Sequence, residues 1–274
     1  MDLITIIILS IIQGLTEFLP VSSSGHLGLF HCFTDQCDQW DAENVTMDIA
    51  VHVGTLFSVI VYFYRDILKM FLGLRDIATQ KGLTPNAKLL VFIIISSAPV
   101  ILCGLILHII EPDWLKTLHV IAWATVIFGI ILWHADAKYP ESKTIDQLTF
   151  KDALIIGAAQ ILALIPGTSR SGITMTAARY LGFSRAESAH YSLLLAIIAI
   201  SGAGALMSLD VIKSGNVSLG MDVLIATILS FISGLLAIAV MMRFLKSCTF
   251  KVFAIYRIAL GGLLLALLYG GYIA

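Results

Sequence analysis

Six apolar stretches, each long enough to cross a bilayer, constrain this sequence of 274 residues more than any other feature. They cover approximately residues 47–64, 89–110, 118–134, 191–209, 223–243 and 258–274. Hydrophobic residues make up 58% of the chain and charged residues 13%, whereas soluble domains carry about 25% charged residues. The sequence therefore predicts an all-α polytopic membrane protein that uses residues 1–274 as a single membrane domain.

Charge and cysteine content exclude several other classes. Seventeen Lys and Arg residues against eighteen Asp and Glu residues leave a net charge of −1, so no nucleic-acid partner is expected. The four cysteines show no zinc-binding spacing, which argues against structural zinc. A disulfide between Cys32 and Cys37 would need an oxidising compartment. The start of the chain lacks signal-peptide features and is expected to be retained.

Two further apolar stretches, about 3–33 and 152–182, are interrupted halfway by a proline and a run of small polar residues. The interruptions are EFLPVSSSGH around Pro20 and ALIPGTSRSG around Pro166. Because proline and Ser-Gly clusters break helices, each stretch is expected to form two half-helices joined by a turn inside the membrane.

Lysines and arginines indicate which loops face the cytoplasm. They crowd four segments, near residues 65–88, 138–151, 179–185 and 243–257, and the positive-inside rule makes these segments cytoplasmic. The loops between them carry few cations and are expected outside. This alternation requires both broken stretches to return to the side from which they enter, and it places both termini outside.

Each half of the chain is thus predicted to be a re-entrant helical hairpin followed by three transmembrane helices. The halves, about residues 1–134 and 135–274, would form an inverted-topology repeat whose broken helices meet near the bilayer midplane. Both breaks place two polar residues and a glycine after the proline: Ser23, Ser24 and Gly25 in the first, and Arg170, Ser171 and Gly172 in the second. Irregular backbone at this depth must line a polar cavity.

Glu17 is the most conspicuous ionisable residue of the first broken stretch. It follows Gln13 by four residues, so both side chains share one helical face. A carboxylate inside a membrane is costly and usually functional. It could bind a divalent cation, accept a proton or pair with a cation, and the purely structural alternative is an ion pair with Arg170.

Ser22, Ser23, Ser24, Gly25 and His26 come soon after Pro20. Small residues let backbone N–H groups converge on an anion at a half-helix N-terminus. A hydroxyl near an imidazole could also act as an activated nucleophile, or the imidazole could activate water. The alternative is a serine N-cap beside an interfacial histidine, and the sequence leaves both readings open.

Arg170 lies inside the second break, where its permanently charged guanidinium suits phosphate oxygens. Its neighbours are small or hydroxylated: Thr168, Ser169, Ser171 and Gly172. Other polar residues are expected to play structural roles. His52, four residues after Asp48, could line the cavity, but a capping or interhelical hydrogen bond is favoured. Arg257 should anchor the last span at the interface.

These motifs resemble those of the undecaprenyl-diphosphatase family, also called the bacitracin-resistance protein family. The matching stretches are QGLTEFLPVSSSGH at residues 13–26, PGTSRSG at residues 166–172 and FAIYR at residues 253–257. With the length and the two-halved layout, the resemblance covers essentially the whole chain. It implies ten helices, four of them in two re-entrant hairpins, arranged as inverted repeats in the bacterial inner membrane.

The resemblance also implies an activity: removal of the terminal phosphate from undecaprenyl diphosphate. The product is the lipid carrier for peptidoglycan and cell-wall synthesis, and resistance to bacitracin follows. The implied catalytic residues are Glu17, Ser23, His26 and Arg170. Substrate binding is expected from the polar residues around them: Gln13, Ser22, Ser24, Gly25, Thr168, Ser169, Ser171 and Gly172.

The implied cofactor is a divalent cation, Mg²⁺ or Ca²⁺, bound at Glu17. The family's acidic motif begins with Glu or Gln and has Glu four residues later. This chain carries Gln13 at the first position, so a pair of carboxylates bridging a metal cannot come from that motif.

Two mechanisms and a second class of function remain open at this level. Ser23, activated by His26, could attack the terminal phosphorus, or His26 or Glu17 could activate water. The head group would lie on the periplasmic side, with the polyprenyl tail in the bilayer. A lipid flippase would use the same inverted repeat and arginine without needing Ser23 or His26. The sequence leaves a homodimer undecided.

Overall fold

The computed structural model describes residues 2–33, 42–80, 82–110, 112–214 and 220–271. In these ranges the chain forms eleven α-helices and no β-strand. The helices are α1 (Leu3–Thr16), α2 (Ser23–Phe33), α3 (Ala42–Tyr62), α4 (Tyr64–Ala78), α5 (Pro85–Ile110), α6 (Leu118–Lys138), α7 (Phe150–Gln160), α8 (Arg170–Tyr180), α9 (Arg185–Ser214), α10 (Met221–Phe244) and α11 (Lys251–Tyr269). The predicted all-α class is confirmed.

Six of these helices are long and apolar enough to cross a membrane: α3, α5, α6, α9, α10 and α11. They coincide with the six stretches expected from the sequence, which confirms a multi-pass membrane protein. On α5 the outward side chains are apolar, with Leu102 62% exposed and Ile109 82% exposed. Surfaces of this kind are stable against lipid and unfavourable in water.

Both interrupted stretches break where the prolines predict. The helix α1 ends at Thr16, and α2 begins after Ser22, whose φ is 75°. The helix α7 ends at Gln160, a short 3₁₀ turn follows, and α8 begins after Ser169, whose φ is 69°. A positive φ at a residue other than glycine is uncommon and marks a sharp change of chain direction.

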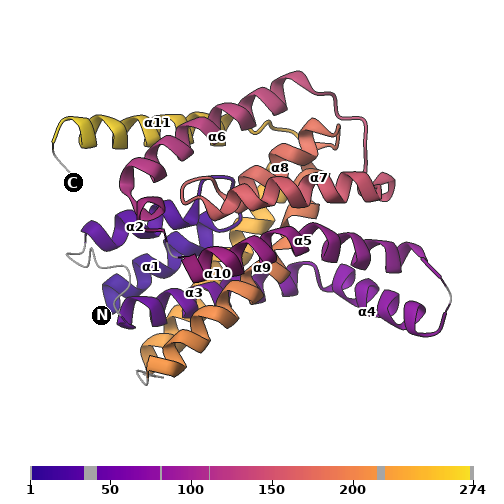
Figure 1. Ribbon diagram of the computed structural model, residues 1–274, viewed down its shortest axis with the longest axis horizontal. Coiled ribbons are helices and arrows are strands. Elements are labelled where there is room, and N and C mark those ends of the chain that lie inside the picture. Colours follow the sequence, from indigo (N-terminus) through magenta and orange to yellow (C-terminus); the bar gives the residue numbers. More distant parts are fainter. Residues whose placement is uncertain (1, 34–41, 81, 111, 215–219, 272–274) are drawn as a thin grey trace.

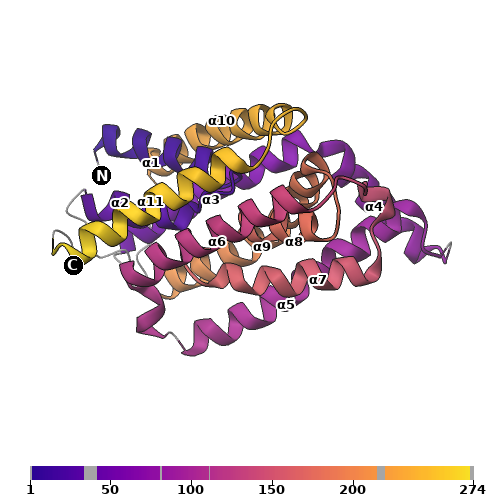
Figure 2. The same ribbon diagram turned by 90° about the horizontal axis from the view of Figure 1, so that it is seen from above.

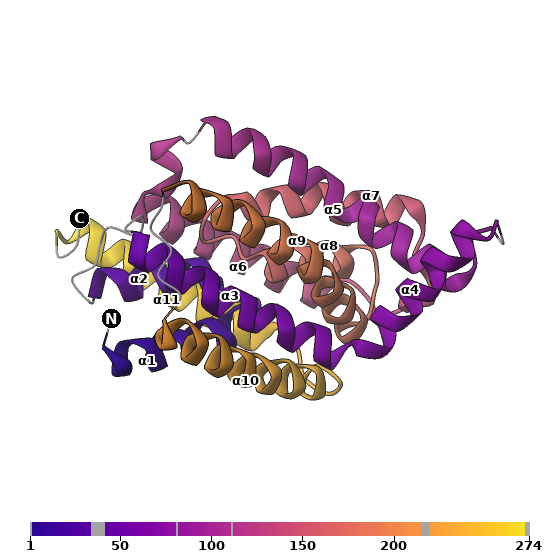
Figure 3. The ribbon, with the colours of Figure 1, turned by 90° about the horizontal axis from the view of Figure 1, so that it is seen from below.

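The half-helices of each broken stretch pack against each other, α1 on α2 and α7 on α8. Many of the other contacts pair helices of the first half with helices of the second: α1 and α3 with α10, α5 with α7 and α9, α3 with α9, and α6 with α11. Figures 1 and 3 show these long helices running side by side. Small residues permit the closest approaches, since a Cβ on Gly54 would collide with the carbonyl oxygen of Thr227 on α10.

The start of α1 and the end of α11 lie at one end of the bundle, and α4 lies at the other (Figures 1 and 2). The sequence analysis expected the segment containing α4 to be a charged loop. The structure instead has an amphipathic helix there, with Leu68 and Phe71 exposed and with Arg65 and Lys69 near its start. This helix accounts for the count of eleven rather than ten.

A buried ion cluster joins the ends of α6, α8 and α9. Asp136 Oδ1 lies 3.4 Å from Arg179 Nε and 2.6 Å from Arg185 Nε. Its Oδ2 accepts a hydrogen bond of 2.9 Å from the backbone N–H of Phe250, just before α11. Arg179, expected among solvated loop cations, is fully buried. The cluster therefore fixes helix ends rather than presenting charge to solvent.

Candidate functional site

Glu17 and Arg170 meet where the two breaks approach each other. The guanidinium Nη2 of Arg170 donates a hydrogen bond of 3.0 Å to Glu17 Oε1. Both side chains are largely shielded from solvent, with 8% of Glu17 and 13% of Arg170 exposed. The ion pair that the sequence analysis considered as a structural alternative is therefore present, and it lies within a larger group of polar side chains.

The second carboxylate oxygen of Glu17, Oε2, contacts three further side chains. Gln13 Nε2 donates to Oε2 at 3.0 Å, and Ser23 Oγ donates to the same oxygen at 2.8 Å. His52 Nε2 approaches it at 3.9 Å, while its Nδ1 lies 2.6 Å from the carbonyl oxygen of Asp48. The structure thus brings Gln13, Ser23 and Glu17 together as expected, and it adds His52, for which the less favoured of the two readings, a place in the cavity, is the one observed.

Arg170 is held on its other side by α9. Its Nη1 donates to the carbonyl oxygen of Ser192 at 3.0 Å, and Thr174 Oγ1 lies 2.7 Å from Ser192 Oγ. Because a guanidinium is planar, contacts on two of its nitrogens fix its orientation. The side chain is therefore aimed at the first break before any ligand arrives.

The serines of both breaks act largely as helix caps. Ser169 Oγ accepts a hydrogen bond of 3.1 Å from the backbone N–H of Gly172. Ser22 Oγ has the same relation to Gly25, at 3.4 Å. Ser171 Oγ, in the second break, donates a hydrogen bond of 3.0 Å to the carbonyl oxygen of Leu19 in the first break. The capping alternative thus describes Ser22 and Ser169, whereas Ser23 contacts Glu17 directly. Ser24 Oγ lies 3.4 Å from Ser22 Oγ.

His26 contacts groups other than Ser23. Its Nδ1 lies 2.7 Å from the carbonyl oxygen of Ser22, and its Nε2 lies 2.6 Å from Tyr256 Oη. A carbonyl oxygen can only accept, so Nδ1 carries the proton and Nε2 accepts from the tyrosine hydroxyl. Within the described part of the chain, no hydrogen bond joins His26 to Ser23, and the carboxylate of Glu17 is the base in contact with that hydroxyl.

Arg257 is the polar residue that the sequence analysis placed wrongly. It was expected at the membrane interface, yet it is fully buried. Its Nη2 donates to the carbonyl oxygens of Gly167 at 2.9 Å and Thr168 at 2.8 Å, and its Nη1 lies 3.5 Å from that of Pro20. The signal that could have located it is the FAIYR motif at residues 253–257, because an interfacial anchor needs an arginine but no particular residues before it.

The charge of Arg257 is also unbalanced. Among the described residues, none of the carboxylates forms an ion pair with it, and its polar contacts are carbonyl oxygens. Gly172 is necessary for this arrangement, since a Cβ there would lie 2.6 Å from Arg257 Nη1. A buried guanidinium without a counter-ion makes the site favourable for an anion.

Several buried polar atoms at the breaks lack a partner in the described structure. They include Gln13 Oε1 and Thr168 Oγ1. Buried polar atoms are nearly always hydrogen-bonded, so these two mark places where a ligand or water completes the bonding. Thr168 can donate its hydroxyl to an anion, and the Gln13 oxygen can accept a hydrogen bond or bind a cation.

The carboxylates do not form a conventional metal cluster. Across the described ranges, no group of three or more His, Cys, Asp or Glu side chains is placed to hold a metal ion. Any cation at Glu17 would need oxygen ligands of other kinds. The proposed Cys32–Cys37 disulfide lies outside the side chains that the structure describes.

The fold and this site define a polytopic helical membrane protein with a preorganised, anion-attracting site inside the bundle. The family model described as bacitracin resistance protein BacA matches residues 6–263, and the chain belongs to that family.

Curated relatives share nearly the full length. The undecaprenyl-diphosphatase of Ruegeria pomeroyi is 43% identical over 270 residues, covering 98% of this chain and 100% of the relative. Those of Roseobacter denitrificans and Saccharophagus degradans are 44% and 42% identical, again over 98% of this chain. They cover 100% and 99% of those relatives. The family resemblance drawn from the motifs is confirmed.

Proposed function

We propose that this protein hydrolyses the terminal phosphate of undecaprenyl diphosphate to give undecaprenyl phosphate. The observation that carries the proposal is the contact of Glu17 with Arg170 at 3.0 Å and with Ser23 at 2.8 Å. It combines a base, a hydroxyl and a phosphate-binding cation at one point. Membership of the BacA family and the printed name of the relatives support the same substrate. The reaction recycles the lipid carrier for cell-wall synthesis and counters bacitracin.

The inverted-topology repeat is part of this proposal. Under an exchange of α1 with α7, α3 with α9 and α5 with α10, the contact of α1 with α10 becomes that of α7 with α5, and both are present. The contact of α3 with α10 likewise becomes that of α9 with α5. Ser22 and Ser169 match in conformation and in capping. The two hairpins would then be re-entrant, with both termini and the head-group site on the periplasmic side.

Substrate binding follows from the charges already present. The diphosphate would take the place of Glu17 as the partner of Arg170 Nη2. The charge of Arg257, which is buried against the backbone of both breaks, would further attract the diphosphate. The hydroxyl of Thr168, unpartnered in the described structure, would donate to a phosphate oxygen. Backbone N–H groups at the start of α8 add further donors. These groups bind and orient the diphosphate.

The nucleophile in this scheme is Ser23. Glu17 Oε2 accepts the proton of the Ser23 hydroxyl as Oγ bonds to the terminal phosphorus, and the bond from that phosphorus to the bridging oxygen breaks. Undecaprenyl phosphate leaves, and water then hydrolyses the phosphoserine to release inorganic phosphate. In the alternative, Glu17 activates water directly. His26 would hold the first break through Ser22 and Tyr256 in either case.

A divalent cation fits the oxygen atoms available, although the second carboxylate is absent. Gln13 Oε1, Glu17 Oε2 and Ser23 Oγ belong to neighbouring side chains, and Gln13 Oε1 has no other described partner. Oxygen-only ligands suit Mg²⁺ and Ca²⁺. When bound, the cation would neutralise diphosphate charge and stabilise the charge of the transition state.

The test is phosphate release by purified protein from long-chain and short-chain prenyl diphosphates, with and without a chelator. Release should be lost in Glu17→Ala, Ser23→Ala and Arg170→Ala. If no condition gives release, while the protein moves polyprenyl phosphate across vesicle membranes, the flippase is the correct function and hydrolysis is refuted.

A further inference from the structure

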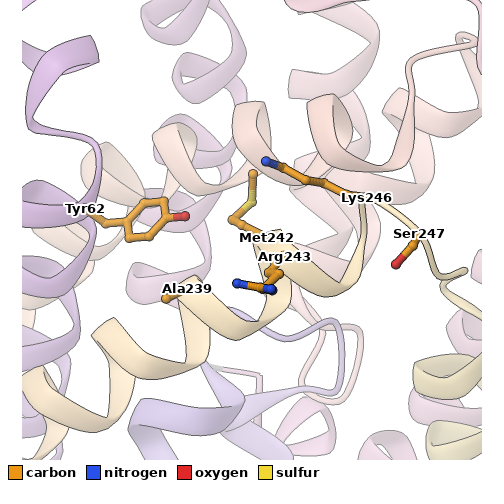
Figure 4. Close-up of a pocket in the computed structure, with 6 residues that line it drawn as sticks. All are labelled: Tyr62, Ala239, Met242, Arg243, Lys246 and Ser247. Carbon is orange, nitrogen blue, oxygen red and sulfur yellow. The ribbon is translucent and has the colours of Figure 1, made fainter.

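A basic hollow lies at the end of the bundle that also carries α4, away from the site between the breaks. It has a volume of about 660 Å³ and is lined by Tyr62 of α3 and by residues at the end of α10 and just beyond it: Ala239, Met242, Arg243, Lys246 and Ser247. Figure 4 shows Tyr62 reaching toward α10, with the Lys246 and Arg243 side chains turned toward Tyr62. We call these six residues the basic hollow.

The two cations of the basic hollow have no acidic partner in the described structure. Neither Arg243 nor Lys246 forms an ion pair there, and both are exposed. The C-terminal end of α10 carries the equivalent of about half a negative charge, which offsets only part of their charge of +2. Roughly one and a half positive charges therefore remain, and an anion would balance them.

The two helices that line the basic hollow, α3 and α10, also carry exposed apolar side chains in the turns before it. On α10, Leu236 is 60% exposed and Val240 is 68% exposed, one turn apart on one face. On α3, Phe57 is 51% exposed and Val61 is 47% exposed with the same spacing. A cationic, hydroxyl-bearing hollow at the ends of two helices with exposed apolar side chains matches an amphiphile with an anionic head group.

We propose that the basic hollow binds the phosphate head group of an anionic membrane phospholipid, whose acyl chains lie along the exposed faces of α3 and α10. Arg243 and Lys246 would pair with the phosphate oxygens, and Ser247 and Tyr62 would donate hydroxyl hydrogen bonds. The positive-inside assignment places this end in the cytoplasmic leaflet, where anionic lipids attract basic segments. The site is separate from the diphosphate site and does not depend on hydrolysis.

The experiment measures lipid binding to delipidated, detergent-purified full-length protein by native mass spectrometry and thermal shift. The probes are phosphatidylglycerol, phosphatidylcholine and inorganic phosphate. The test variant is the double substitution Arg243→Gln with Lys246→Gln. A matched control is Lys138→Gln with Lys251→Gln, which removes two exposed charges, one at the end of α6 and one at the start of α11.

Phosphatidylglycerol should bind the unaltered protein and the control equally, and bind the test variant about 25-fold more weakly, about fivefold for each charge removed. Equal weakening in the control, or equal binding of phosphatidylcholine, would overturn the proposal. Protection by inorganic phosphate alone, equal to that by phosphatidylglycerol, would show a free-anion site and reject the lipid. Unchanged phosphate release and gel-filtration behaviour establish that the test variant is folded.

Discussion

The carboxylate of Glu17 forms an ion pair of 3.0 Å with Arg170, although the two residues are separated by 153 positions in the chain. Each belongs to a different helix break. The pair therefore couples the two half-helix turns, and it joins the negative and positive groups that the proposed reaction needs. A structural ion pair and a catalytic pair predict different behaviour when both partners are changed.

Replacing Glu17 alone should lower both stability and activity. Glu17→Gln leaves Arg170 buried without its counter-ion, which costs about 3–5 kcal/mol. It also removes the base, so kcat should fall roughly 10²–10⁴-fold. The double substitution Glu17→Gln with Arg170→Gln should recover most of the Tm in detergent and none of the activity. Recovery of phosphate release together with Tm would make the pair purely structural.

Replacing Ser23 should separate the two chemical routes. Ser23→Ala should lower kcat roughly 10³-fold or more if its hydroxyl is the nucleophile. Acid quenching of the unaltered enzyme during turnover should then reveal phosphoserine at position 23 by mass spectrometry. Ser208→Ala is a suitable control, because the Ser208 hydroxyl donates to the carbonyl oxygen of Gly204 within its own helix, α9. A Ser23→Ala enzyme that keeps a tenth of its kcat would indicate direct attack by water.

Replacing Arg257 should disturb both breaks at once. A lysine keeps the charge but cannot reach the carbonyl oxygens of Gly167, Thr168 and Pro20 from one compact ammonium group. Each lost charge-assisted bond costs about 1.5–3 kcal/mol, so Arg257→Lys should lower Tm by several degrees. It should lower kcat about tenfold with little change in KM, because the turns that hold Arg170 and Glu17 shift. Arg65→Lys, on exposed α4, should change neither quantity.

The hydrogen bond between His190 of α9 and Asp66 of α4 should make the stability of the fold depend on pH in the acid range. The hydrogen bond from His190, followed by that from Lys69, lowers the pKa of Asp66 from 3.8 to about 2. Since the folded-state pKa is below the unfolded value, the stabilisation is complete above about pH 4 and is lost as the pH falls toward 2. The drop in Tm over this range should be smaller in Asp66→Asn. An identical acid profile in that variant would contradict the assignment.

Much of the architecture could be predicted from the chain itself. The six spans follow from apolar runs matched to bilayer thickness, and the breaks follow from Pro20 and Pro166, whose effects on helix geometry are local. The helix α4 was missed because its exposed Leu68 and Phe71 alternate with charged residues, and the resulting stretch is too polar for a membrane span. Such amphipathic helices are stabilised by the interface in which they lie.

The sequence by itself determined the class of protein, its spans and the two polar motifs, because these depend on residues near one another in the chain. Only the tertiary structure decided which groups meet: Ser23 with Glu17 rather than with His26, His52 beside the same carboxylate, and Arg257 buried beneath both turns. Ser23 and Glu17 lie on either side of the break at Pro20, His52 comes from α3, and Arg257 comes from the last helix. The formation of these contacts depends on how the helices pack, which no local pattern of residues specifies.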